Sequence, residues 1–238
     1  MNETLQLLFP PRCISCGLSG VRHCSACALM WRGHFRNSIE GIAVHSSVLY
    51  NHSVAHILMR AKEDNDRSAR KVIADSIRRF IPPYSTIIPI PSSPEALRRR
   101  GFDHSLLLAR AIDPRAEHVL KIIRKIEDQT ELSHEERYQN LHRAYVAGNY
   151  FLPRVVLLDD VITTGSSIRE ALRALREVKI APIAVISAGL ASHPIPNTIS
   201  HLTTGGTVGD FGQDSSRRRR SSSKALREDR GANQRTRK

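Results

Sequence analysis

Two adjacent aspartates, Asp159 and Asp160, end the apolar run VVLLDD, and the small residues of VITTGSS follow them at once. The apolar run indicates a buried strand, and IREALRAL has helical spacing, so the segment predicts a strand, a loop and a helix over 167–178. In open α/β sheets, ligands bind where a strand ends and the chain turns into a helix. The two acids therefore lie where a ligand is expected.

The loop after the aspartates suits a phosphate, because its small residues offer backbone amides and hydroxyls and the following helix adds a favourable dipole. The carboxylates would repel a phosphate, so they must face hydrogen-bond donors such as vicinal sugar hydroxyls or hydrated magnesium. A sugar 5-phosphate meets both demands, whereas the lysine of a GxxxxGK[ST] nucleotide loop is missing. A plain strand–turn–helix with two capping acids is the alternative. The predicted phosphate-binding residues are Thr163, Thr164, Gly165, Ser166 and Ser167.

The four cysteines form two CxxC pairs, CISC and CSAC, between positions 13 and 27. The first residues lack the pattern of a signal peptide, so we expect a cytoplasmic protein in which disulfides are improbable. Two CxxC pairs can bring four thiolates onto one zinc ion, and such a closed site is structural. Free thiols or a redox pair are the alternative. The predicted metal ligands are Cys13, Cys16, Cys24 and Cys27.

Strands and helices alternate around these motifs. GIAVHSSVLY, STIIPIP, VLKII and IAVISAGL read as strands, and helical spacing runs over 54–61, 67–80 and FDHSLLLARAI. This alternation predicts an α/β fold, a parallel sheet with helices on both faces. We expect a cysteine-bearing segment over 1–35, one main domain over 36–205 and a tail over 206–238.

The formal net charge is +13. From Asp210 onward the tail holds ten Lys and Arg residues and four Asp and Glu residues, a net +6 with almost no apolar residues, so we expect it to be disordered. The remaining +7 suits a protein that handles phosphates or nucleic acid, and a solvated basic surface is equally compatible. No apolar run is long enough to span a bilayer, so no membrane partner is expected.

The segment VVLLDDVITTGSS resembles the phosphoribosyl pyrophosphate (PRPP) motif of type I phosphoribosyltransferases. LLFPPRC with its CxxC pairs, PIPSSPEALRRRGF, QTELSHEERYQNL and LLDDVITTGSS also occur in the order seen in the ComF family, competence-associated phosphoribosyltransferase-like proteins. The resemblance covers about residues 5 to 190. It implies a type I phosphoribosyltransferase-like parallel sheet, a small hood over the site and an N-terminal zinc-binding segment.

The resemblance also implies roles for individual residues. Asp159 and Asp160 would be the catalytic pair that binds the ribose hydroxyls, residues 163–167 would bind the 5-phosphate, and magnesium would accompany PRPP. The loop after STIIPIP would hold pyrophosphate, and Lys62 matches a lysine that family members commonly place before the first long helix. The residues near pyrophosphate would be Ser92, Ser93 and some of Arg98, Arg99 and Arg100. For the arginines alone, a solvated helix start is the alternative.

One departure from the family pattern concerns the residues after the arginines. Family members usually read RGFNQ, whereas this chain has Asp103 and His104 in place of the amide pair. Gln129, Arg137 and Asn140 match the family, and 129–140 is expected to be a mobile loop that closes over PRPP, with Arg137 on the pyrophosphate. A solvated helix with ordinary charge pairs is the alternative.

Two functions from different classes follow. The first is an enzyme, a glycosyltransferase that moves phosphoribose from PRPP to an unidentified nitrogen acceptor and releases pyrophosphate. The second is a catalytically silent PRPP-binding or DNA-handling accessory protein linked to competence. The basic charge favours a nucleic-acid partner only weakly, and an aromatic content of 5% gives no evident stacking platform. The sequence makes no prediction about oligomeric state.

Overall fold

A central five-stranded sheet organises the protein in the computed structural model, which describes residues 10–124, 141–150 and 152–191. All of these belong to the first of two units, Met1–Gly205. The strand order is β1-β2-β7-β6-β3. β2, β7, β6 and β3 are parallel, and β1 is antiparallel to β2. The strands are β1 (Phe35–Ile39), β2 (Ile42–Leu49), β3 (Thr86–Pro89), β6 (Val155–Ile162) and β7 (Ala184–Leu190).

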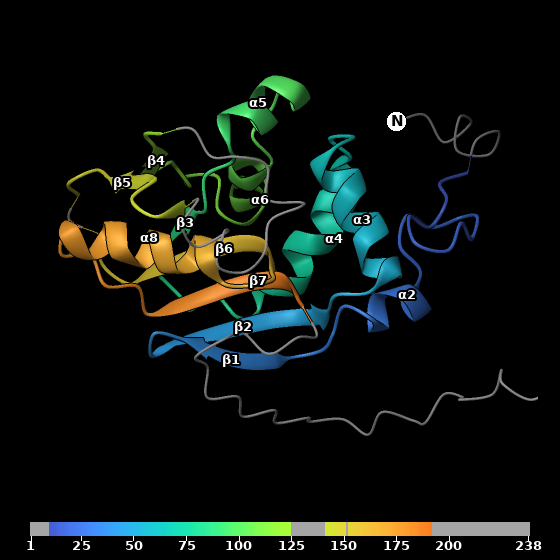
Figure 1. The fold of residues 1–238 in the computed structure, drawn as a ribbon. Coiled ribbons are helices and arrows are strands. Elements are labelled where there is room, and N and C mark those ends of the chain that lie inside the picture. The colour runs from blue at the N-terminus through green and yellow to red at the C-terminus, as the bar shows by residue number, and fades with distance from the viewer. Residues whose placement is uncertain (1–9, 125–140, 151, 192–238) are drawn as a thin grey trace, which may run out of the picture. The chain divides into compact units, whose positions relative to one another are not determined.

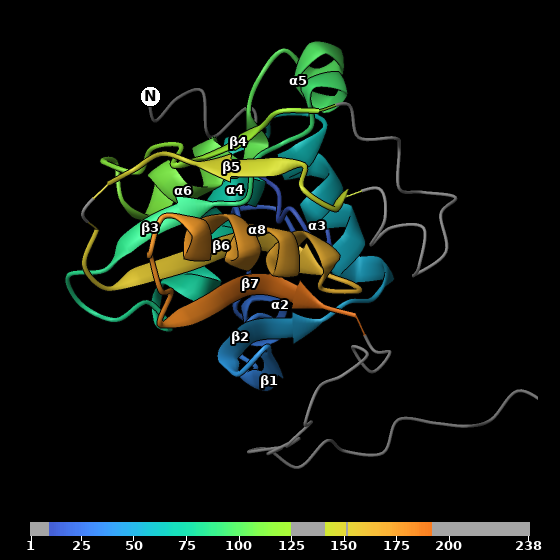
Figure 2. The ribbon, with the colours of Figure 1, turned by 60° about the vertical axis from the view of Figure 1, so that its left-hand side comes forward.

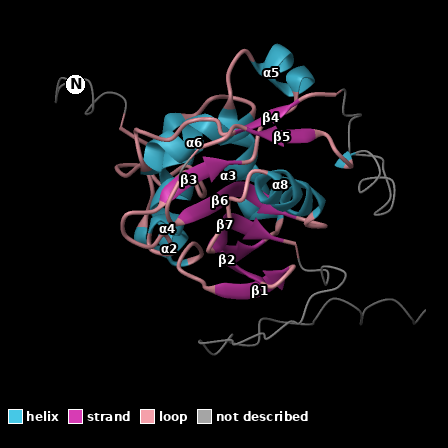
Figure 3. Ribbon diagram, turned by 90° about the vertical axis from the view of Figure 1, so that its left-hand side faces the viewer, coloured by secondary structure: helices cyan, strands magenta, loops and turns pink. Residues whose placement is uncertain are grey.

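Helices cover both faces of the sheet, as Figures 1 and 3 show for α8 on one side and α4 and α6 on the other. One core contains Val156 and Leu158 of β6 and packs under α3, α4 and α6. The other contains Val155 and Leu157 and packs under α8. This alternation is the period of two that a strand imposes. The predicted α/β fold is therefore confirmed. The helices are α3 (His52–Lys62), α4 (Arg67–Arg78), α6 (His104–Ile112) and α8 (Ser166–Glu177).

Short polar side chains cap the amino ends of α3, α4 and α6. Asn51 accepts a hydrogen bond from the Val54 amide at the start of α3, Asp66 caps α4, and Asp103 caps α6. A further short helix, α5 (Pro94–Arg100), is capped by Ser93 at its start and by Gly101 at its end. The φ of Gly101, 72°, lies in the left-handed region. Capping satisfies backbone groups that a helix leaves unpaired at its ends, and glycine is the residue that ends a helix in this way most easily.

A two-stranded antiparallel ribbon, β4 (Leu120–Ile122) and β5 (Tyr145–Ala147), packs on α8 and forms the small hood (Figure 2). Two side chains of α8 hold it. Glu170 Oε1 accepts a hydrogen bond from the Tyr145 amide at 3.0 Å, and Arg173 Nη2 donates to the Tyr145 carbonyl at 2.6 Å. Glu170 and Arg173 are themselves paired at 2.8 Å. The ribbon is therefore attached to the helix that follows β6.

The N-terminal segment, which carries the cysteines and the helix α2 (Ser25–Leu29), packs on the α3 and α4 side of the sheet. Ile14 and Trp31 are buried in the core beneath these helices. Arg22 Nη1 donates to Ser68 Oγ of α4 at 3.3 Å. The segment therefore contacts the main domain through buried apolar side chains and through this hydrogen bond.

Candidate functional site

A cavity of about 1420 Å³ lies at the carboxyl ends of β2, β3 and β6. Parallel strands bring their carboxyl ends to one edge, which explains why segments far apart in the sequence meet here. Its wall also contains apolar residues of the ribbon and of α3, among them Ile122 and Leu58. The predicted site residues that line it are Lys62, Ser92, Ser93, Arg99, Arg100, Asp159, Asp160, Thr163 and Ser167.

Asp159 and Asp160 both line the cavity, and a side-chain hydrogen bond joins their carboxyl groups. Asp160 meets α3 and α6, and Asp159 lies near Tyr145 of the ribbon. The chain between them is braced by local bonds, since each carboxylate accepts a hydrogen bond from the next amide at 2.8 Å. Each acid therefore contacts different residues in addition to the other acid.

Asp160 is paired with a lysine. Lys62 Nζ lies 2.9 Å from Asp160 Oδ2, and His104 Nε2 lies 3.6 Å from the same oxygen. Burial disfavours the charged carboxylate, but the Lys62 ammonium outweighs this and holds the pKa of Asp160 well below its usual range. The negative charge of Asp160 in turn raises the pKa of Lys62. Asp160 is therefore an ionised hydrogen-bond acceptor.

Asp159 has the opposite tendency. Burial raises the pKa of Asp159 well above its ordinary value, and the negative charge of Asp160 raises it further. The hydroxyl of Tyr145 forms a hydrogen bond with Ser167, and burial together with the charge of Asp159 raises the pKa of Tyr145. The site thus combines an ionised acceptor, Asp160, with a neighbouring carboxyl whose pKa is raised.

The loop between β6 and α8 turns through Gly165, whose φ of 76° and ψ of 6° place it in the left-handed region. Glycine adopts this conformation without steric cost. Thr164 Oγ1 and Ser166 Oγ are buried and lie 2.8 Å apart, so these two hydroxyls satisfy each other. Thr163 and Ser167 line the cavity instead. At the start of α8, Thr164 Oγ1 accepts a hydrogen bond from the Ser166 amide at 3.3 Å, and Gly165 at the N-cap position has no side chain to add another. The helix therefore presents its amino end to the cavity edge.

The loop after β3 carries Ser92 and Ser93 to the opposite wall of the cavity. Ser93 caps α5, and its Oγ accepts a hydrogen bond from the Ala96 amide at 3.2 Å. Ser92 Oγ donates to Asp103 Oδ1 at 3.1 Å, and His118 Nε2 lies 2.9 Å from Asp103 Oδ2. Burial opposes the charge of Asp103, but the hydrogen bond from His118 outweighs it and lowers the pKa. Asp103 thus holds Ser92 in place.

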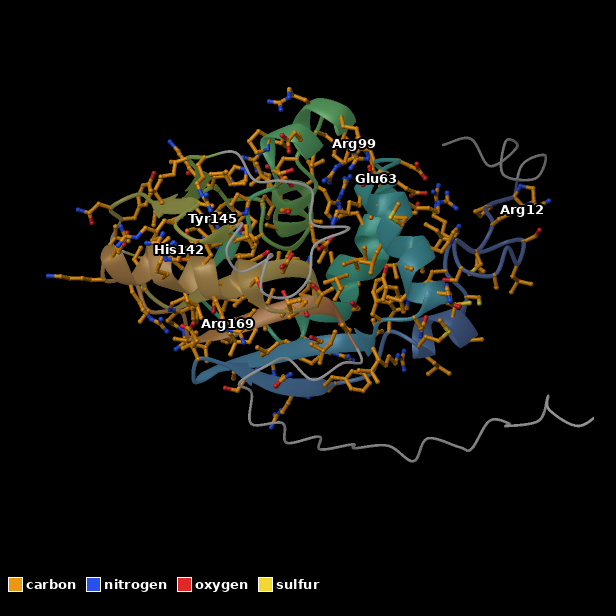
Figure 4. All side chains as sticks on the ribbon, in the orientation of Figure 1. Arg12, Glu63, Arg99, His142, Tyr145 and Arg169 are labelled. Atoms are coloured by element: carbon orange, nitrogen blue, oxygen red, sulfur yellow. The ribbon has the colours of Figure 1, made fainter. Side chains whose placement is uncertain are left out.

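The three arginines of α5 have different surroundings. Arg99 Nη1 lies 2.5 Å from Glu63 Oε2, and Figure 4 shows the two side chains meeting between α5 and α3. Arg100 is nearly buried, and its Nε lies 3.8 Å from Glu63 Oε1. Arg98 is 71% exposed and does not line the cavity. Of the predicted arginines, Arg100 and Arg99 therefore border the site and Arg98 faces solvent.

The four cysteines converge. The sulfur atoms of Cys13, Cys16, Cys24 and Cys27 all lie within 4.8 Å of one another, so they can hold one metal ion. Although burial raises the pKa of the Cys13 thiol, hydrogen bonds from the Cys24 amide and its neighbours lower it to about 6. Burial raises the pKa of Cys27 to about 12. Backbone amides directed at sulfur are what a thiolate needs when it binds metal.

Several residues of the cavity were not anticipated from the sequence. Tyr145 lies on a three-residue strand with no detectable period, and Tyr50 follows β2 with no motif around it. Glu63 had one available signal, its position next to Lys62. The predicted lid residues Gln129, Arg137 and Asn140, and the tail over 206–238, lie outside the described residues. Within the described residues, no helix is long and apolar enough to cross a membrane.

Comparison with known proteins agrees with this geometry. Residues 101–197 match the family model of the phosphoribosyl transferase domain. Over 108 residues, 42% of this chain and 47% of the relative, the chain is 35% identical to competence protein F of Haemophilus influenzae. It is 26% identical over 174 residues to competence protein ComFC of Streptococcus pneumoniae, covering 70% of this chain and 74% of that protein. The chain is therefore similar to competence proteins of the ComF type and carries a phosphoribosyl transferase domain.

A second ComFC supports the same assignment. Competence protein ComFC of Bacillus subtilis is 26% identical over 178 residues, which cover 69% of this chain and 71% of that protein. The chain spans about half the length of the Haemophilus ComF relative and more of the two ComFC proteins. The matched domain includes Asp159, Asp160 and the loop 163–167, whereas Lys62 and the four cysteines precede it. The phosphoribosyltransferase-like fold expected from the sequence is confirmed.

Proposed function

We propose that this protein binds PRPP in the cavity and transfers its phosphoribosyl group to a nitrogen acceptor. The observation that carries this proposal is the joint position of an ionised carboxylate and the amino end of α8 on one cavity wall. Asp160 offers acceptors for ribose hydroxyls, and the loop 163–167 offers amides and hydroxyls for the 5-phosphate. A sugar phosphate is the ligand class that needs both.

The chemistry requires no covalent bond to the protein. The nitrogen lone pair attacks the anomeric carbon, the bond from that carbon to the pyrophosphate oxygen breaks, and the electron pair leaves with pyrophosphate. The nitrogen then loses a proton. Positive charge develops on the ribose ring, as in glycoside cleavage, and Asp160 is placed to stabilise it. Arg100 and Lys62 border the cavity and are placed to attract the leaving anion.

Two metals enter the proposal differently. We assign a structural zinc ion to Cys13, Cys16, Cys24 and Cys27, whose closed four-thiol arrangement suits zinc and leaves no position for substrate. Among the described residues this is the only group of three or more such ligands close enough to hold a metal. Magnesium would therefore be bound mainly by the phosphate oxygens of PRPP, as it often is in phosphate-binding sites, and would neutralise their charge.

Release of pyrophosphate tests the proposal. The full chain is incubated with PRPP and magnesium, with and without a panel of nucleobases and amines, and pyrophosphate is measured. We expect acceptor-dependent release that Asp160→Asn reduces at least about tenfold, the effect of losing one transition-state hydrogen bond. PRPP binding without release for any acceptor would contradict transfer and leave a binding protein.

A second function has one specific observation behind it. The relatives matched here are named competence proteins. A PRPP-binding accessory protein without turnover that serves competence or DNA handling is consistent with those names and with the basic charge of the chain. Binding of PRPP with no release, together with salt-sensitive DNA binding by the full chain, would favour this function over transfer.

A further inference from the structure

His104 is a buried histidine whose two ring nitrogens both face oxygen atoms. Its side chain is 1% exposed, Nδ1 lies 3.2 Å from the Ala61 carbonyl oxygen of α3, and Nε2 lies 3.6 Å from Asp160 Oδ2. Nε2 has no hydrogen-bond partner within the described residues. A buried ring nitrogen left without a partner and directed at a carboxylate of the site requires an explanation.

The two contacts cannot both be satisfied by a neutral imidazole, which has one N–H donor and one lone pair. When Nδ1 carries the proton it donates to the Ala61 carbonyl, and the Nε2 lone pair then faces the carboxylate. When Nε2 carries the proton, the conflict moves to the carbonyl. Only the protonated ring can donate to both oxygens. The hydrogen bonds that His104 can donate therefore differ between its two protonation states.

Asp160 has a limited number of acceptor positions. Its Oδ1 accepts a hydrogen bond from the Val161 amide at 2.8 Å, and its Oδ2 accepts one from Lys62 at 2.9 Å. Each carboxylate oxygen has two lone-pair positions. The Asp160 carboxylate also forms a hydrogen bond with the Asp159 carboxyl. With neutral His104, the amide, Lys62 and Asp159 leave one of the carboxylate's four lone-pair positions open. A protonated His104 would occupy it.

We propose that His104 is a positioning residue for Asp160. Its neutral ring leaves a lone-pair position of Oδ2 open to a sugar hydroxyl, and its protonated ring takes that position. The inference rests on the proposed function, because the open position matters only if a sugar binds Asp160. It also explains the departure at position 104, where a glutamine, which does not titrate, would give Asp160 the same neighbour at every pH.

The charged groups around His104 favour the neutral ring. Lys62 of α3 and Arg100 of α5 repel an imidazolium, Asp160 of β6 attracts it, and Asp159 follows Asp160 on the same strand. Burial is the largest influence, and it lowers the pKa of His104. The open form of Asp160 is therefore the form present at neutral pH, and acidification closes it.

Binding of ribose 5-phosphate as a function of pH tests the inference. Affinities of the full chain and of His104→Gln are measured by calorimetry from pH 8 to pH 4.5. The ligand's own phosphate titrates equally with both proteins, so the ratio of the two affinities reports on residue 104. We expect wild-type affinity to fall on acidification by a further factor of roughly two to ten relative to His104→Gln, the size of one hydrogen bond.

A matched control uses His56→Gln on the exposed side of α3, which should follow the wild-type curve. Parallel curves for wild type and His104→Gln would overturn the inference alone, provided that both proteins bind the ligand. Absence of ribose 5-phosphate binding by the wild type at every pH would overturn the proposed function and the inference together. The two failures are therefore distinguishable.

A second measurement uses the unmodified chain and does not depend on how the variant folds. Protonation of His104 and ligand binding are coupled, and the coupling must be reciprocal. Saturating ribose 5-phosphate should raise the acid dissociation constant of the His104 ring by the same factor of roughly two to ten, so that the ring titrates at lower pH. Nuclear magnetic resonance follows this titration. An unchanged titration, or a shift to higher pH, would refute the competition between the imidazolium and the sugar.

Discussion

Lys62 Nζ lies 2.9 Å from Asp160 Oδ2 and so joins the last residue of α3 to the carboxyl end of β6. The carboxylate is 11% exposed and the lysine 38%, so the pair is shielded on the side of the acid. Arg100 Nη1 also donates to the backbone carbonyl of Lys62, at 3.5 Å. The end of α3 is thus held by β6 and α5 together, and the acid of the site has a fixed counter-charge.

Lys62→Met removes this counter-charge and keeps most of the apolar stem. We expect the free energy of unfolding at pH 7 to fall by roughly 1–3 kcal/mol, less than for a fully buried pair because Lys62 is partly exposed. The pKa of Asp160 is depressed in the folded state, so this contribution is fully present above the ordinary aspartate pKa of about 3.9 and is lost progressively as pH falls from there through the depressed folded pKa.

Urea unfolding of the wild type and of Lys62→Met at pH 7 and near pH 3 checks both parts. The difference between their free energies of unfolding should narrow in acid. Lys71→Met is the matched control, because its partner Asp75 and Lys71 itself are both more than half exposed. That variant should change stability by less than about 0.5 kcal/mol. Equal effects of the two variants at pH 7 would contradict the role assigned to Lys62.

Asp160→Asn should weaken the stabilisation that ribose 5-phosphate gives the protein, because one ribose hydroxyl loses a charged acceptor. The expected loss is roughly 1–3 kcal/mol of binding free energy. It is measured as the ligand-induced shift of the melting temperature, with exposed Asp75→Asn as control. A shift that stays the same in Asp160→Asn would remove the ribose assignment.

Gly165→Ala introduces a Cβ atom where φ is 76°, which costs about 1–2 kcal/mol in folding stability. We also expect weaker binding of ribose 5-phosphate, because relief of the strain moves the amides at the start of α8. Gly41→Ala is the control, since its φ is 82° and it lies in the hairpin turn away from the cavity. Both variants should lose stability, and only Gly165→Ala should lose affinity. A normal affinity in Gly165→Ala would place the phosphate elsewhere.

The cysteine cluster should bring one zinc ion per chain through purification. Metal analysis of freshly reduced protein tests this, and Cys13→Ser should lose the ion because a four-thiol site needs every ligand. Ser25→Ala, an exposed change beside Cys24, should retain it. Zinc-free wild-type protein that is fully folded would show that the four thiols do not form a structural site.

Glu170→Ala should loosen the ribbon from α8. It leaves the Tyr145 amide and Arg173 without their shared acceptor, at a cost of roughly 1–3 kcal/mol. Hydrogen exchange at the Tyr145 amide should accelerate. Glu177→Ala is the control, because that carboxylate pairs with Arg173 but is 58% exposed. If the Tyr145 amide exchanges at an unchanged rate in Glu170→Ala, the ribbon is held by other contacts.

The β6–loop–α8 segment could be predicted closely because its apolar run and helical spacing are both strong. The predicted helix over 167–178 differs from Ser166–Glu177 by one residue at each end. β1 was not predicted, since FRNSI has little apolar period and gains its stability by pairing with β2. Its hairpin turns through Glu40 and Gly41, both at positive φ, and Glu-Gly is a weaker turn signal than Asn-Gly.

The site was predictable only in part for a similar reason. The acids and the loop are contiguous in the sequence, so their chemistry could be inferred directly. Lys62 and Asp160 are 98 positions apart, and Tyr145 reaches the cavity only because Glu170 and Arg173 hold its backbone. The sequence shows that Asp159 and Asp160 are adjacent at the end of one strand. What each of them meets there depends on the packing of other elements.

The size of the cavity has a kinetic consequence. At about 1420 Å³ it exceeds the roughly 300–1,000 Å³ usual for a single small ligand. A sugar phosphate and an acceptor can therefore occupy it at the same time. Transfer would then proceed through a ternary complex, and double-reciprocal plots for the two substrates would intersect instead of running parallel.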